Sequence, residues 1–301
     1  DELRDALDNI LNAFEHIEGL GSLLDVKGTL ADLIDENGGQ LDAFKDEEIV
    51  TLPQLLERLH DTVDEHVEGG SFRAKDLRSF LRLLVVLSQD YDVSLMNPPY
   101  GSGNRMPDDV QEYVESHYEY TSNFYINFFE IGDRLSNRSG RVSMIVPHSL
   151  MFNKSFSDFR SDFVGSKGGF EFMSEFGYGI LDNATVGTIG TVIVSSKEDE
   201  QKSGKFIKLS DVDKEDKEVK LSKTISNNNN IVEEKRVYDK RLEELSIIDG
   251  TPLSYWIPEN IRNLYSSKIV IDANSANVSN KKSLGEVNQG LGTGNNDRFV
   301  R

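Results

Sequence analysis

Apolar side chains recur at helical spacing in the first third of the chain. The segments 51–67 and 75–89 each place apolar residues three and four positions apart, which is the period of a helix with one buried face. Pro53 lies near the start of the first of these segments, where proline is tolerated. We therefore predict that residues 1–66 are largely helical, and that residues 1–90 form a helical segment ahead of the rest of the chain.

After residue 90, short apolar runs alternate with amphipathic stretches. The short runs predict strands, and the stretches with apolar positions at helical spacing predict helices. Ser122 is the expected N-cap of the first of these helices. In chain order the elements are a buried strand at 92–96, a helix at 121–137, a buried strand at 140–147, a helix at 155–165, and strands at 169–177 and 184–196. Strands that alternate with helices predict an α/β fold in which helices cover a sheet.

Changes in composition divide the chain into four segments. Residues 201–250 are polar and charged and include a serine-asparagine tract at 226–230, which predicts a polar insertion or linker at the edge of the sheet. A new unit is predicted over residues 251–301. The α/β unit therefore occupies residues 91–200, between the helical segment and the insertion.

Composition excludes several classes of protein. The chain has 301 residues and no cysteine, which excludes disulfides and thiolate metal sites, and no other group predicts a metal centre. No apolar run is long enough to span a bilayer and no signal peptide is visible, so we predict a cytoplasmic protein without a membrane partner. Because the chain begins with Asp1 rather than methionine, we expect it to be a piece of a longer protein.

The net charge of −19 is concentrated in the first third, where residues 1–90 carry 21 acidic and 8 basic side chains. A face that follows phosphates should be basic, because counterion release drives that binding, so this segment is a poor candidate for a nucleic-acid interface. Strong acidity is also typical of proteins from salt-loving sources, because acidic surfaces stay hydrated in high salt. Loss of folding at low salt would support that hypothesis, and full stability there would contradict it.

The sequence Asn97-Pro98-Pro99-Tyr100 ends the predicted strand at 92–96. The prolines fix φ near −65° and remove two backbone N–H groups, so no local donor competes there. The Asn97 side-chain oxygen and the Pro98 carbonyl can then both face one amino group, and Tyr100 follows as a flat surface for a planar ring. Ligands bind at the carboxyl ends of strands in open α/β sheets, which makes this tetrapeptide the candidate site.

An exocyclic amino group on a purine needs this combination of groups. Its lone pair is delocalised into the ring, and two acceptors on its hydrogens stabilise the positive charge that develops when the nitrogen is alkylated. Positioning against an electrophilic methyl group supplies most of the remaining catalysis. The base must leave the duplex to be reached, and stacking on an aromatic ring recovers about 1–3 kcal/mol of that cost.

These residues and their context resemble the amino-group DNA methyltransferases that use S-adenosylmethionine. The order "NPPYGSG", "NFYINFFEIGDRL" and "GRVSMIVPHSLMF" is similar to the N6-adenine branch, which has the catalytic domain first and the target-recognition domain last. The segment 181–194 resembles the later strand of that branch, and 290–301 resembles the entry to its target-recognition region. With "LGSLLDV" upstream and "YWIP" downstream, the chain is most similar to the BREX-type (PglX) phage-defence methylases.

The resemblance implies a partial Rossmann-like methyltransferase sheet and site-specific N6-adenine methylation of double-stranded DNA by S-adenosylmethionine, the activity of EC 2.1.1.72. Partners would include other subunits of a defence complex. Residues 91–200 would be the catalytic half and residues 251–301 the start of the target-recognition region. In this family Asn97 and the Pro98 carbonyl would bind the adenine amino group, while Pro99 holds the corner and Tyr100 stacks on the flipped base.

Two departures from the family pattern bear on the site. The family's second aromatic residue falls, by spacing, on Leu181, which stacks weakly on a base; Phe176 and Tyr178 are the alternatives. The glycine-rich cofactor loop is not visible in residues 1–90 and is expected upstream of Asp1. His148, which follows a predicted strand near the site, is interpreted as structural.

Three functions therefore stay open. The first is a BREX-like methyltransferase, and the second is the modification part of a type I or type IIG restriction-modification enzyme. The third is a non-catalytic DNA-binding or assembly module of methylase fold, which the leucine at position 181 and the missing cofactor loop favour.

Overall fold

The computed structural model describes residues 10–11, 20–36, 52–66, 72–101, 107–181, 186–195, 203–226, 236–266, 269–270 and 282–283. The α-helices are α2 (Val26–Glu36), α3 (Leu52–His66), α4 (Phe72–Ser88), α5 (Asp108–His117), α6 (Phe124–Leu135), α7 (Val164–Ser166), α8 (Lys217–Ser226), α9 (Leu242–Leu245) and α10 (Glu259–Arg262). Short 3-10 helices are η1 (Gly21–Leu23), η4 (His148–Met151), η5 (Lys154–Phe156), η7 (Lys214–Asp216) and η8 (Asn263–Ser266), and η6 (Phe159–Phe163) is a π-helix.

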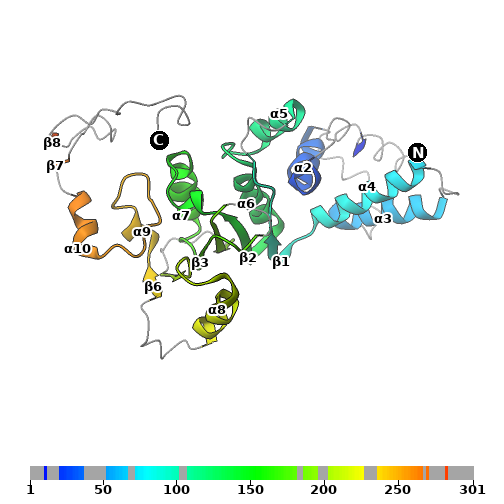
Figure 1. Ribbon diagram of the computed structural model, residues 1–301. Helices are drawn as coiled ribbons and strands as arrows, with labels where there is room; N and C mark the ends of the chain where they lie inside the picture. The colour runs from blue at the N-terminus through cyan, green and yellow to red at the C-terminus, as the bar shows by residue number, and fades with distance from the viewer. Residues whose placement is uncertain are drawn as a thin grey trace, which may run out of the picture.

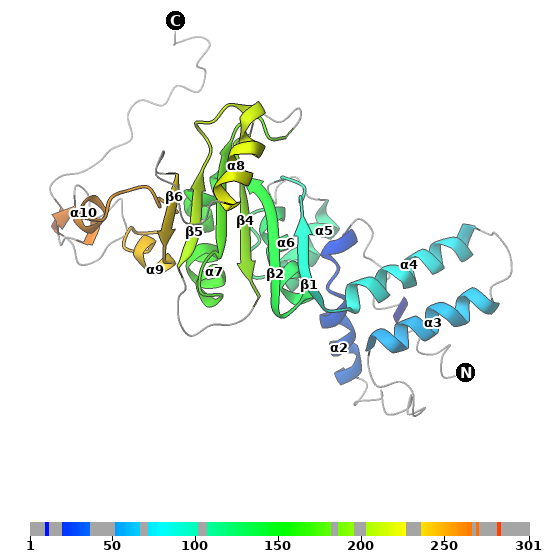
Figure 2. The ribbon, with the colours of Figure 1, turned by 90° about the horizontal axis from the view of Figure 1, so that it is seen from below.

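A mixed six-stranded sheet forms the centre of the molecule (Figure 2). The strands are β1 (Tyr91–Met96), β2 (Ser136–Pro147), β3 (Phe172–Gly177), β4 (Thr188–Val194), β5 (Gly204–Lys208) and β6 (Val237–Lys240), and a separate pair is formed by β7 (Ile269–Val270) and β8 (Lys282–Ser283). The order is β1-β2-β4-β3-β5-β6. β1 and β2 are parallel, as are β3 and β5, whereas β4 runs antiparallel to both of its neighbours.

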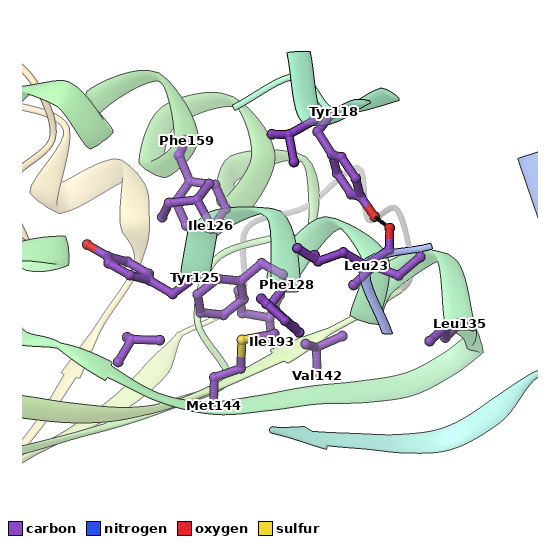
Figure 3. Packing of buried hydrophobic residues seen from close by; sticks show 14 of the residues in the cluster. Leu23, Tyr118, Tyr125, Ile126, Phe128, Leu135, Val142, Met144, Phe159 and Ile193 are labelled. Atoms are coloured by element: carbon purple, nitrogen blue, oxygen red, sulfur yellow. Dashed lines mark hydrogen bonds between the residues drawn. The ribbon is translucent and has the colours of Figure 1, made fainter. Parts of the chain in front are cut away.

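Helices lie on both faces of this sheet, which confirms the predicted α/β fold class. In Figures 1 and 2, α6 and α7 lie on one face and α8 lies on the other, while the α3–α4 pair extends away from the sheet on the side of β1. The amphipathic α6 packs its aromatic side chains against β2, and Figure 3 shows Phe128 between that helix and the side chains of Val142 and Met144. The two strands that matter for the candidate site are thus backed by one aromatic helix.

The helical N-terminal segment is tied to α6 by polar contacts. Arg134 donates to Asp25 Oδ2 at 2.5 Å and to the His117 carbonyl at 2.7 Å, and its guanidinium lies 4.8 Å from the ring centre of Tyr118. The Tyr118 hydroxyl donates to the carbonyl of Leu23, the bond drawn in Figure 3. Residues before α2 are therefore fixed to the helix that covers β1 and β2.

Most elements predicted from periodicity are confirmed. Within the described residues, the segments predicted as helices before residue 90 contain α2, α3 and α4, and the predicted strands correspond to β1, β2, β3 and β4. The alternating burial of β2 confirms that this strand is buried. Most of the tract at 226–230 and all of 290–301 lie outside the described residues.

Two local predictions were wrong, and one predicted helix has an irregular turn. The N-cap of α6 is Asn123, which has extended backbone and no capping side-chain bond, and the Ser122 hydroxyl donates to the carbonyl of Ser155 at 3.2 Å. The predicted helix at 155–165 is confirmed as a helical run over 154–166, in which a π turn at Phe159–Phe163 buries the neighbouring side chains Phe159 and Arg160 together.

The second wrong prediction is that β1 is buried. Val93 is 58% exposed and Leu95 is 76% exposed. Ser94 and Met96 face α6, so the alternation of side chains along the strand turns Val93 and Leu95 to the opposite face of the sheet, which the described residues leave uncovered there. An apolar strand therefore presents one face to solvent beside the candidate site.

No helix in the described part of the chain is both long and apolar enough to cross a membrane. Across those same residues, no group of three or more His, Cys, Asp or Glu side chains could hold a metal ion.

Candidate active site at the carboxyl end of β1

The tetrapeptide Asn97 to Tyr100 leaves the sheet directly after β1, without regular secondary structure. Asn97 and Pro99 are exposed, whereas Pro98 is buried and Tyr100 is half-buried. The carbonyl of the next residue, Gly101, accepts a hydrogen bond from the first residue of α6 at 3.2 Å. The corner is therefore held at both ends, by the last residue of β1 and by the start of the aromatic helix.

Tyr100 is anchored through its hydroxyl group. That hydroxyl donates to the Ile145 carbonyl of β2 at 3.0 Å and lies 3.3 Å from Asn97 Oδ1. The ring makes an edge contact with Tyr125 of α6, with centroids 6.2 Å apart. Burial raises the pKa of Tyr100, so the hydroxyl stays protonated at neutral pH.

One hydroxyl has one proton to donate, and the shorter bond goes to Ile145. Asn97 therefore keeps acceptor capacity on its exposed side-chain oxygen, next to a fixed aromatic ring. An exposed carboxamide acceptor beside a held ring is suited to a planar partner that carries an amino group.

The end of β2 brings a second set of polar side chains to the same edge of the sheet. His148 Nε2 lies 3.6 Å from Glu175 Oε1, and Tyr255 donates its hydroxyl proton to the other oxygen of that carboxylate. The backbone N–H of His148 donates to the Gly187 carbonyl at 2.8 Å. Sequence reasoning missed Glu175 and Tyr255, which lie 80 positions apart and carry no local motif.

Burial by itself would raise the pKa of Glu175, but hydrogen bonds from His148, Tyr255 and Ser210 outweigh it and hold the pKa at about 2. An unperturbed glutamate has a pKa of about 4.3. Because the folded-state pKa is lowered, the ionised carboxylate adds stability that is fully present above the unfolded pKa. That contribution is lost as the pH falls toward the folded pKa.

We expect a Glu175→Gln variant to be less stable than wild type at pH 5, by a margin that shrinks as the pH falls from about 4.3 toward 2, because glutamine cannot titrate there. Urea unfolding of both proteins at matched pH values measures that margin. A margin that stays the same between pH 5 and pH 2.5 would show that the Glu175 carboxylate is not held in its ionised form by the fold.

The three residues considered for the second face of the base differ in exposure. Phe176 is half-buried and contacts the backbone at Gly190, Leu181 is half-buried, and Tyr178 is 70% exposed. The Tyr178 ring lies beside Gly187 at the start of β4, on the edge where β1 and β2 end. The structure thus places Tyr178 at the same edge of the sheet as the end of β2, whereas sequence spacing points to Leu181.

A strand that ends in Asn-Pro-Pro-Tyr at the carboxyl edge of an α/β sheet is the arrangement expected of an amino-group methyltransferase. The chain belongs to the Eco57I restriction-modification methylase family, whose family model matches residues 20–176. The resemblance to adenine methylases found in the sequence is thereby confirmed.

Two curated proteins are similar to most of the chain. The adenine-specific methyltransferase PglX of Lacticaseibacillus casei (strain Zhang) is 26% identical, over 98% of this chain and 22% of that protein. The adenine-specific methyltransferase BrxX of Escherichia coli O9:H4 (strain HS) is 25% identical, over 72% of this chain and 18% of that protein. The chain thus spans about a fifth of the length of the curated relatives it matches.

Solved structures show weaker likeness. A nuclease-deletion mutant of the type ISP restriction-modification enzyme LlaGI, in complex with a DNA substrate mimic, gives a TM-score of 0.45 at 13% identity, over 77% of this chain and 20% of that one. A type I restriction-modification methyltransferase subunit from Streptococcus thermophilus gives 0.42 at 14% identity, over 62% and 46%. These scores are too low to assign function.

Proposed function

We propose that the full-length protein methylates the N6 amino group of adenine in double-stranded DNA, with S-adenosylmethionine as methyl donor, as part of a phage-defence system. The observation that carries the proposal is the exposed Asn97 carboxamide held next to Tyr100 at the carboxyl end of β1. Membership of a methylase family supports the reaction class, and similarity to PglX and BrxX supports adenine as the target.

Each residue of the tetrapeptide has a proposed role. Asn97 Oδ1 and the Pro98 carbonyl accept the two hydrogens of the adenine amino group and stabilise the positive charge that develops at nitrogen. Pro99 fixes the corner through its constrained φ. The Tyr100 ring, held by its hydroxyl bond to β2, stacks on the flipped base. Leu181 remains the family-based candidate for the opposite face of the base.

The described residues do not by themselves fit the methyl donor. The element that would hold S-adenosylmethionine is a glycine-rich loop between a strand and a helix. Among the described residues that precede β1, however, all regular elements are helical. We therefore assign no residue of the described part of the chain to the cofactor. When bound, S-adenosylmethionine would supply an electrophilic methyl group.

Other parts of the proposal concern the whole protein. We propose double-stranded DNA and other subunits of a defence complex as partners, and the cytoplasm as the place where such DNA is reached. The division into a helical segment, a catalytic half, a polar insertion and the start of a target-recognition region also stays a proposal. A type I or type IIG restriction-modification enzyme is the second candidate, which the restriction-modification family match favours.

The identity of the methylated base tests the proposed function. The full-length protein, with its neighbouring defence genes, is expressed in a host without adenine methylases, and the nucleosides of the host DNA are quantified by mass spectrometry. We expect N6-methyladenine at a single sequence motif. N4-methylcytosine instead would contradict the choice of adenine, and DNA without any methylated base would favour the non-catalytic module.

A further inference from the structure

Lys217, the first residue of α8, is a buried lysine whose ammonium group binds the end of β3. The residue is 5% exposed, and Nζ donates to the carbonyl oxygens of Phe176 at 2.6 Å and Tyr178 at 2.7 Å. Burial lowers the pKa of Lys217, an effect that the nearby Asp213 carboxylate opposes. Two carbonyl groups two positions apart therefore share one ammonium ion at the point where β3 ends.

The backbone between these carbonyls adopts an unusual conformation. Gly177 and Gly179 have φ values of +69° and +86°, in the left-handed region that favours glycine. A Cβ added at Gly177 would lie 3.0 Å from the Cα of Ser210, so the turn is also packed closely against the residues after β5. The turn 176–179 is thus held by Lys217 on α8 and by Ser210, both from the polar segment after β4.

This turn places the ring of Tyr178 beside the start of β4, next to the residue that follows β2. The Tyr178 Cζ atom lies 3.8 Å from the point that a Cβ at Gly187 would occupy, and the Cβ of His148 lies 3.5 Å from the same point. His148 follows β2, which pairs in parallel with the strand that leads to Asn97. The ring therefore extends from the end of β3 over the start of β4, toward the end of β2.

An exposed aromatic ring on a fixed turn has a physical advantage for binding. A planar ligand that stacks on it does not have to order a mobile backbone first, so less conformational entropy is lost when the complex forms. Removing a lysine ammonium group from water costs free energy. Such a cost is expected where the turn must keep one conformation.

We propose that Lys217 is a positioning residue for the methylation reaction, which holds the turn 176–179 so that Tyr178 covers the face of the flipped adenine opposite Tyr100. The inference rests on the proposed function. It assigns the second aromatic surface to Tyr178 in place of Leu181, and it gives the polar segment 201–250 a role in placing the target base.

The test compares variants of the full-length protein on DNA that carries its methylated motif. We expect Tyr178→Ala to lower kcat/KM for DNA about ten- to a hundredfold, while Tyr178→Phe keeps the ring and most of the activity. Lys217→Met is expected to lower kcat/KM about tenfold. In the Tyr178→Ala variant the same substitution should lower kcat/KM less than about twofold, because the lysine acts through the Tyr178 ring. The matched control is Lys223→Met, on the exposed side of α8.

A 2-aminopurine base at the target adenine gives a readout that does not depend on methyl transfer. Its fluorescence rises when it leaves the duplex and is quenched when it stacks on an aromatic ring. We expect the Lys217→Met complex to be brighter than the Lys223→Met complex and to approach the brightness of Tyr178→Ala. Hydrogen exchange of the amides at 177–181 should also be faster in Lys217→Met.

The outcomes separate the inference from the function on which it rests. A wild-type protein that makes no N6-methyladenine would refute the proposed function and the inference with it. Full activity of Lys217→Met beside an active wild type would overturn the inference alone. Equal losses of kcat/KM from Lys217→Met in the wild type and in the Tyr178→Ala variant would also overturn the inference. The lysine would then not act through the Tyr178 ring.

Discussion

Replacing Asn97 with alanine in the full-length protein should lower the rate of adenine methylation by about a hundred- to a thousandfold, the usual loss when one group that stabilises transition-state charge is removed. Asn97 is exposed, and its side-chain oxygen lies 3.3 Å from the Tyr100 hydroxyl, which keeps its shorter bond to β2. The fold should therefore be unaffected. Initial rates of methyl incorporation into DNA, measured under saturating donor, report the change.

The matched control is Asn97→Asp. Aspartate has the same shape and keeps an acceptor oxygen in place of Asn97 Oδ1, so we expect it to retain more activity than alanine. Thermal unfolding of both variants should be within about 0.5 kcal/mol of wild type, as for an ordinary surface substitution. Methylation by Asn97→Ala at the wild-type rate would show that Asn97 takes no part in the reaction.

Replacing Arg160 with methionine should reduce the free energy of unfolding by about 3–5 kcal/mol. Arg160 is 1% exposed, and burial lowers its pKa to about 10, so it remains charged at neutral pH. Its guanidinium donates four hydrogen bonds to backbone carbonyls, which belong to Leu150, Asn153, Gly250 and Thr251. Methionine fills similar space but leaves these buried carbonyl groups without a hydrogen-bond donor. The cost of keeping them away from water without a partner lowers the free energy of unfolding.

Arg141 provides the comparison. It makes a bidentate pair with Glu171, at 2.7 and 2.8 Å, but both side chains are more than 40% exposed. Solvent competes for such a pair, so Arg141→Met should cost less than about 1 kcal/mol. Urea unfolding and local hydrogen exchange at 148–160 measure both variants. Equal effects of the two substitutions would show that burial of the Arg160 carbonyl contacts is not the stabilising factor.

The arrangement of helices and strands could be predicted from the sequence because hydrophobic periodicity records which side of each element is buried. The site tetrapeptide stays a prediction, and it could be proposed from the sequence for a different reason. Asn97 and the prolines carry their chemistry in the local backbone, so four adjacent residues contain the signal.

Contacts between distant segments left no such signal. Lys217 lies 39 positions from Tyr178, in a stretch whose many charges indicate only solvent exposure, yet its ammonium is buried. The exposure of Leu95 also escaped prediction, because an apolar run does not show whether both faces of a strand are covered. What covers each face of a strand is decided by the rest of the fold.

The exposed edge of β1 has a consequence for handling the molecule. An edge strand with free backbone groups and apolar side chains is a template for pairing with a strand of another chain. The register irregularity between Tyr91 and Val93, together with the exposed charge of Asp92, interrupts such pairing at the start of β1. Val93 and Leu95 are exposed, so self-association of a preparation of these residues would begin beside the Asn97–Tyr100 corner and would cover the candidate site.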